Sequence, residues 1–100
     1  MVQSVLVEVP AAEFARKYRG MVMLLQEISK HGDVGISTSK LCYKVFKSRD
    51  SFCMKQLDLA EEWGYTTREV VHLEGRGHPY KINKITSRGK KLLQEIRANI

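Results

Sequence analysis

A glycine-rich turn between two β-rich runs places the strongest constraint on how this chain can fold. The stretch VVHLEGRGHPYKINKI, residues 70–85, carries Gly75, Gly77 and Pro79 around its tip. Glycine and proline supply the backbone angles of tight turns, so a β-hairpin is predicted over residues 67–86. A sustained helical pattern, SRGKKLLQEIRANI, follows at once. We therefore expect an α+β fold, mostly helical, with its hairpin late in the chain.

The longest helical pattern precedes the hairpin, at residues 11–31. Pro10 suits its first turn and Gly32 its end. Gly20 lies inside this pattern, where glycine is unfavourable, and it predicts a close helix crossing or a bend. The apolar residues follow spacings of four and three, which place them on one helix face: Phe14, Tyr18, Met21, Leu25 and Ile28.

Three shorter helices are predicted at residues 37–47, 50–63 and 87–99. Ile36 is expected in a short strand before the first of them, and residues 1–10, which include VQSVLVEV, in an extended arm. Each short helix begins at side chains that can cap its free amide groups. The candidate caps are Ser37 or Thr38, Asp50 or Ser51, and Thr86 or Ser87.

Composition predicts one domain with a basic surface. The 100 residues are 43% hydrophobic, enough for a single core, and 17 Lys and Arg against 11 Asp and Glu give a net charge of +6. Such a charge suits a partner rich in phosphate, although a surface tuned for solubility has the same charge. The position of the basic residues must distinguish these two interpretations.

The chain has no features of a secreted or membrane protein. No basic and apolar leader follows Met1, and the most apolar run, MVMLL, is much shorter than the ~20 residues of a membrane span. Two cysteines are too few for a secreted disulfide scaffold. We therefore expect a soluble, cytoplasmic protein that does not interact with membranes.

Catalytic and cofactor-binding motifs are also missing. The sequence has no CxxC spacing for a metal and no catalytic Ser, His and Asp arrangement. The GRG is not a phosphate-cradling loop, because it lies at the turn of a predicted hairpin. We expect no enzyme activity, no cofactor and no metal.

Positive charge is concentrated in the middle of the chain. Lys40, Lys44 and Lys47 are four and three residues apart, which places them on one side of the helix 37–47. They could be ordinary solvated lysines, or they could bind an anionic partner.

The helix 50–63 orders its charges against its own dipole. Basic residues lie before or within its first turns (Lys47, Arg49 and Lys55), and acidic residues lie in its last turns (Asp58, Glu61 and Glu62). A helix dipole favours the reverse order. An anion that faces the beginning of this helix would explain the reversal.

The order of these elements resembles a known family. LDLAEEWGY ends a leucine-rich helix at Gly64 and Tyr65, and GRGHPYKINKITSRGKKLL carries the hairpin into a last helix through Ile85, Thr86 and Gly89. These motifs resemble the winged helix-turn-helix domains of prokaryotic and archaeal transcription regulators, especially the MarR-like and PadR-like groups. The resemblance covers residues 11–97 and implies a three-helix core, a β-hairpin wing and a C-terminal helix.

The chain departs from the family pattern at three places. Asn83 stands where the family usually has an aromatic residue, and we expect a β-bulge or an early strand end there. The GRGHP tip is closer to the PadR-like than to the MarR-like wing. No long dimerisation helix follows the domain, so the helix 11–31, the last helix or the N-terminal arm would have to form a dimer interface.

The resemblance implies a homodimer that binds double-stranded DNA as a transcription regulator in the nucleoid. Its third helix would enter the major groove, with Lys55 and Gln56 at base edges, and its wing would reach the backbone or the minor groove. Phosphate contacts would come from Arg49 and Ser51, and His78 would lie at the wing tip. Further contacts to the DNA backbone are expected from Lys40, Lys44, Lys47, Arg76 and Lys81. The alternatives are a protein-interaction module and an architectural chromatin protein.

The two cysteines flank the corner of the implied helix-turn-helix. Cys42 lies about one turn before it and Cys53 about one turn after it. Their side chains could meet across the packed helix faces as a disulfide, remain as two buried thiols, or bind a metal with a histidine.

Overall fold

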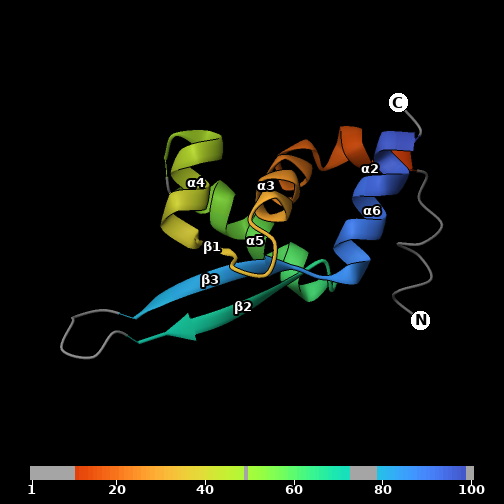
Figure 1. Cartoon of the computed structure of the whole chain (residues 1–100). Helices are drawn as coiled ribbons and strands as arrows, with labels where there is room; N and C mark the ends of the chain where they lie inside the picture. Colours follow the sequence, from red (N-terminus) through yellow and green to blue (C-terminus); the bar gives the residue numbers. More distant parts are fainter. Residues whose placement is uncertain (1–10, 49, 73–78, 99–100) are drawn as a thin grey trace.

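The computed structural model describes residues 11–48, 50–72 and 79–98. The helices pack into one body, from which two long strands extend (Figure 1). The elements, in chain order, are α2 (Ala11–Lys17), α3 (Arg19–Lys30), β1 (Ile36–Ser37), α4 (Thr38–Phe46), α5 (Ser51–Glu62), β2 (Thr66–Val71), β3 (Tyr80–Ile85) and α6 (Ser87–Ala98). The α+β, mostly helical class is confirmed. No helix in these three ranges is both long and apolar enough to cross a membrane.

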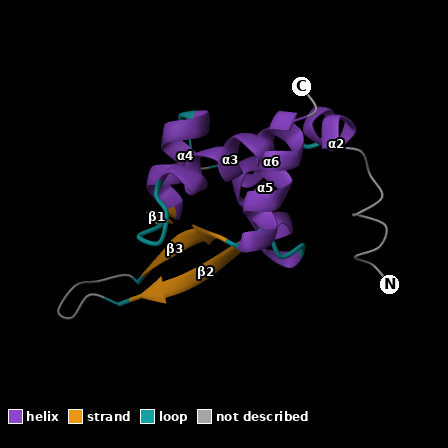
Figure 2. Cartoon of the chain, turned by 45° about the vertical axis from the view of Figure 1, so that its right-hand side comes forward, coloured by secondary structure: helices purple, strands orange, loops and turns teal. Residues whose placement is uncertain are grey.

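The strands form one antiparallel sheet in the order β1-β3-β2. β2 and β3 pair along their whole length, from Thr66 opposite Ile85 to Val71 opposite Tyr80. The short β1 pairs with the other edge of β3. The sheet lies beneath the helices, and β2 and β3 project beyond α4 (Figure 2). β1 therefore joins β3 to the helical body, and β2 forms the opposite edge of the sheet.

The first predicted helix is divided into two. It breaks at Tyr18, whose backbone leaves the helical region (φ −117°, ψ 44°). The Tyr18 ring packs against Phe14 and Trp63, with centroid distances of 4.9 and 5.1 Å. Apolar spacing continues through the break, which is why the pattern alone does not reveal it. Gly20, two residues later, is the close crossing: an added Cβ would lie 2.9 Å from the Phe52 ring.

Two groups of buried side chains form the core. The first joins α2, α3, the end of α5 and α6, and the second joins α3, β1, α4 and α5. α3 contributes to both, so it connects the terminal helices to the α4–α5 pair. The first group includes Phe14, Met21, Leu25, Tyr65, Leu93 and Ile96, and the second Leu24, Ile28, Ile36, Leu41 and Leu57.

The expected bulge or early strand end at Asn83 is wrong. β3 continues in regular register past this residue, which pairs with Arg68 on one side and Ile36 on the other. The buried Asn83 amide donates hydrogen bonds to the carbonyl oxygen of Ile36 (3.2 Å) and to Thr38 Oγ1 (3.0 Å). A polar residue is stable here because it joins the sheet to the beginning of α4.

Helix caps account for the beginnings of three helices. In each predicted pair the first residue accepts a hydrogen bond from an amide three residues later: Ser37 from Lys40 (3.4 Å), Asp50 from Cys53 (3.0 Å) and Thr86 from Gly89 (3.0 Å). These caps lie in the turns between elements, so they help to fix the residues at which α4, α5 and α6 begin.

Candidate DNA-binding surface

A disulfide joins the two helices of the helix-turn-helix. Cys42 of α4 and Cys53 of α5 are bonded, with their Cα atoms 6.2 Å apart and a sequence separation of 11. Both side chains are fully buried. Of the three possibilities open from the sequence, the structure contains the disulfide, and this bond fixes α5 against α4 at the corner between them.

The exposed face of α5 lies opposite this disulfide. Successive helical residues are rotated by about 100°. Ser51 and Lys55 fall on the side away from the core, and both are exposed. The buried residues of α5 are Cys53, Leu57 and Ala60. The first turns of α5 therefore present a hydroxyl and an ammonium group to solvent.

Gln56 has a different environment from Lys55. It is half-buried and lies one helical turn after Phe52. The Phe52 ring packs edge-on against Phe46, with their centroids 5.6 Å apart, and lies close to Gly20 of α3. Gln56 thus lies on the flank of α5, between its exposed and buried faces, and is less open to a partner than Lys55.

The three lysines predicted on one helix face are not equivalent. All three are exposed, but α4 ends at Phe46, and Lys47 is its left-handed cap (φ 63°). The Lys44 ammonium lies 3.0 Å from the carboxylate of Glu27 in α3. Glu27 also contacts His31 at 3.0 Å and Lys30 at 3.6 Å. The hydrogen bond from Lys44, helped by His31, lowers the pKa of Glu27 although burial opposes this. Lys44 therefore neutralises a nearly buried carboxylate, a contact that sequence spacing did not reveal.

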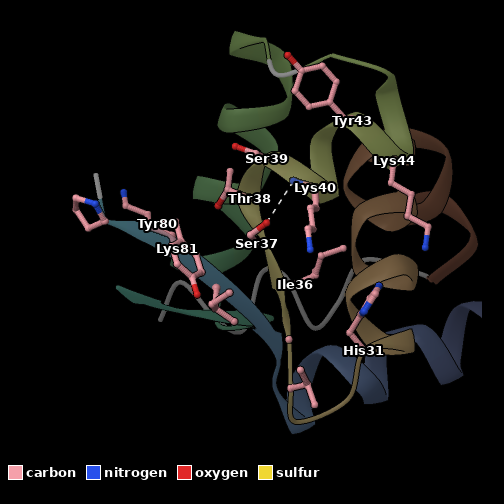
Figure 3. A pocket seen from close by; sticks show the side chains of 14 residues that line it. His31, Ile36, Ser37, Thr38, Ser39, Lys40, Tyr43, Lys44, Tyr80 and Lys81 are labelled. Carbon is pink, nitrogen blue, oxygen red and sulfur yellow. Dashed lines mark hydrogen bonds between the residues drawn. The ribbon is translucent and has the colours of Figure 1, made fainter. Parts of the chain in front are cut away.

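A groove separates α4 from the hairpin. Figure 3 shows Lys40 and Tyr43 of α4 on one side, and Tyr80 and Lys81 of β3 on the other. Tyr43 is 57% exposed, and sequence reasoning missed it. The available signal was an aromatic residue among the lysines of the predicted polar face. The groove combines ammonium and phenol groups, both of which can hydrogen bond to phosphate.

Three residues predicted to bind DNA cannot be placed. Arg49, Arg76 and His78 lie outside the described residues. Lys81, at the beginning of β3, is exposed and pairs in register with Val70 of β2. Of the described candidates, Lys40 and Lys81 line the same groove. Ser51 and Lys55 are exposed on α5, and Lys47 is exposed just after α4.

The acidic end of α5 has a partner that the sequence did not indicate. Nη2 of Arg68, in β2, lies 2.6 Å from both Asp58 Oδ1 and Glu61 Oε1, and its Nε donates to Glu61 at 3.1 Å. Burial would lower the pKa of Arg68, but the hydrogen bonds to Glu61 and Asp58 outweigh it and raise the pKa. The reversed charge order along α5 therefore has a structural cause, and it is not by itself a sign of a bound anion.

Helices α3, α4 and α5, followed by the β2–β3 hairpin and α6, define a winged helix-turn-helix protein. The structure is similar to that of a mutant MepR, a MarR-family winged-helix regulator, from a multidrug-resistant S. aureus clinical isolate. The TM-score is 0.69 at 16% identity, over 96% of this chain and 68% of the MepR chain. No protein-family model and no curated protein match the sequence. The predicted winged helix of MarR-like type is thus confirmed as a fold.

Proposed function

We propose that this protein binds double-stranded DNA as a transcription regulator. The observation that carries the proposal is the exposed beginning of α5, where Ser51 and Lys55 face away from the core, together with the exposed lysines on the preceding helix α4. A winged helix presents this end of its third helix to the major groove, and the hairpin to the backbone or the minor groove. The similarity to a MarR-family regulator supports the same assignment.

Within this proposal, the residues divide by contact. Lys55 reaches a base edge, with guanine as the preferred partner, and Gln56 reaches adenine only at the margin of the contact because it is half-buried. Lys44 contributes charge while it remains paired with Glu27. The phosphate contacts are assigned to Lys40, Lys47, Arg49, Ser51, Arg76 and Lys81, with His78 beside them at the wing tip.

We further propose that the protein acts as a homodimer in the cytoplasm, on the nucleoid. Two copies would then address half-sites about one helical turn, or ~34 Å, apart. The net charge of +6 supports a partner rich in phosphate. An architectural role would use the same surface without sequence preference.

Fluorescence anisotropy with labelled duplex DNA tests the proposal. A random duplex and a pool of genomic fragments are titrated at several salt concentrations. We expect binding to both, and a higher affinity for at least one genomic fragment than for the random duplex. Binding to all fragments with equal affinity would favour an architectural protein. No binding even at low salt would refute the DNA-binding function and favour a protein-interaction module.

Substitution of Lys55 and Arg76 separates base reading from backbone contact. Lys55→Ala is expected to weaken the binding free energy by about 1–3 kcal/mol on the preferred duplex and by less on a random one, because the lost contact is to a base. Arg76→Ala is expected to weaken binding by a similar factor on every sequence, because the lost contact is to phosphate.

Anisotropy on both duplexes measures these effects, with Lys91→Ala as the matched control. Lys91 is an exposed lysine of α6, on the helix that closes the domain and not on the proposed surface. If Lys55→Ala reduced affinity equally on all duplexes, Lys55 would be a backbone contact.

A further inference from the structure

We propose that Arg68 is a positioning residue, which holds the hairpin at a fixed angle to α5 so that both reach DNA as one unit. The inference rests on the proposed function and adds to it the residue that couples the two DNA-contacting elements, α5 and the hairpin. Arg68 itself touches no DNA in this proposal. It acts through Asp58 and Glu61, which lie on the helix that enters the groove.

The geometry of the three side chains supports this role. The guanidinium of Arg68 makes two contacts of 2.6 Å, one to each carboxylate, and a third of 3.1 Å to Glu61. The Arg68 side chain is only 11% exposed, whereas Asp58 and Glu61 are 62% and 41% exposed. A planar guanidinium that donates along fixed directions restricts orientation more than a lysine would. The three side chains thus form a clamp between β2 and α5, termed here the Arg68 clamp.

The position of Arg68 in the sheet explains what the clamp adds. At its base the hairpin is tied by Thr86 Oγ1, which donates to the carbonyl oxygen of Gly64 at 2.6 Å. Farther along, β3 is tied to β1 and to the beginning of α4 through Asn83. Arg68 is the third residue of β2 and pairs with Asn83, so it ties the edge strand β2 to α5 at the same level. Without Arg68 this part of the hairpin is held on its β3 side, and β2 can twist relative to α5.

A second ion pair in the same hairpin provides a control. Glu69 and Lys84 are neighbours of Arg68 on the two strands, and their charged atoms lie 3.2 Å apart. This pair joins β2 to β3 and does not reach α5. Lys84→Met and Arg68→Met therefore each remove one positive charge from the hairpin. Lys84→Met breaks one ion pair within the hairpin, whereas Arg68→Met breaks the two that join it to α5.

The first experiment measures the angle without DNA. Spin labels are attached at Glu62→Cys, at the end of α5, and at His72→Cys, just after β2, both exposed positions. The native cysteines are bonded to each other, so they do not compete for the label. Pulsed electron paramagnetic resonance then gives the distribution of distances between the two labels. We expect Arg68→Met to broaden this distribution and Lys84→Met to leave it unchanged.

An unchanged distribution in folded Arg68→Met would overturn the proposal. Circular dichroism establishes folding of each variant first. If Arg68→Met does not fold, Arg68→Lys replaces it, since it keeps the charge and loses the forked geometry. The expected result is again a broader distribution, and wild-type width would again refute the clamp.

The second experiment separates positioning from electrostatics. Asp58→Ala with Glu61→Ala removes both acceptors of the clamp together with two negative charges on α5. Affinity is compared on a short duplex that covers the α5 contact and on one extended beneath the hairpin. If Arg68 only masked the acidic groups, this double variant would bind both duplexes more tightly. A positioning role predicts instead that the gain from the extension falls by about tenfold, the order expected for loss of a wing contact.

The two experiments also distinguish failure of the clamp from failure of the proposed function. If the wild-type protein bound neither duplex, DNA binding would be refuted, while the label distances would still decide whether Arg68 holds the hairpin. If wild type gained affinity from the extension and the double variant gained equally, the clamp proposal would fail alone.

Discussion

Raising the salt concentration from 50 to 200 mM is expected to weaken binding to duplex DNA by about 10³-fold, an estimate for a protein that makes several phosphate contacts. Each phosphate neutralised by lysine or arginine releases condensed counterions, and added salt opposes this release. The proposed cations are Lys40, Lys47, Arg49, Lys55, Arg76 and Lys81 in each protomer. A dimer doubles this set, so the estimate does not require every residue to make a contact.

Anisotropy titrations at four or five salt concentrations measure the slope of log affinity against log salt. Arg76→Ala should reduce that slope by about 1, because it removes one phosphate contact, whereas Lys91→Ala on α6 should leave it unchanged. A slope near zero for the wild-type protein would contradict binding through the phosphate backbone. The basic surface would then serve solubility or a protein partner.

Breaking the Cys42–Cys53 disulfide is expected to lower the free energy of unfolding by about 3 kcal/mol, the usual contribution of a cross-link that closes a loop of this length. The bond closes a loop with a sequence separation of 11, which reduces the number of conformations open to the unfolded chain. Both cysteines are also fully buried between α4 and α5. Loss of the bond therefore removes the covalent connection within the helix-turn-helix.

Urea denaturation with and without a thiol reductant measures this contribution. The variant with both Cys42→Ala and Cys53→Ala should be less stable than the oxidised wild type and insensitive to reductant. An unchanged denaturation midpoint after reduction, with both thiols shown to be free by chemical titration, would contradict the prediction. The same samples can be tested for DNA binding, where we expect weaker binding because α5 is less firmly held against α4.

Much of the secondary structure follows from local patterns in the sequence. The capping residues Ser37, Asp50 and Thr86 mark the beginnings of three helices, since they satisfy amide groups within the next turn. The GRGHP turn between two β-rich runs predicted a hairpin, and β2 and β3 lie on either side of it. These predictions depend on neighbours along the chain, so one sequence is enough to make them.

Predictions that depended on distant neighbours were less successful. Asn83 appeared to interrupt its strand, but the chain brings Ile36 and Thr38 to its amide. Lys44 appeared to belong to a stripe of equivalent lysines, but α3 brings Glu27 to its ammonium group. In both cases the decisive partner is more than 15 residues away, beyond the range of helical or strand periodicity.

The sequence by itself determined the order of the elements and their caps, and its motifs carried the resemblance to winged-helix domains. The elements and caps depend on backbone propensities and periodicity, which each segment carries wherever it is placed. Only the tertiary structure decided the break at Tyr18, the choice of disulfide over free thiols, and the pairing of Arg68 with Asp58 and Glu61. The reason is physical: these features depend on which surfaces meet when the helices and the sheet pack.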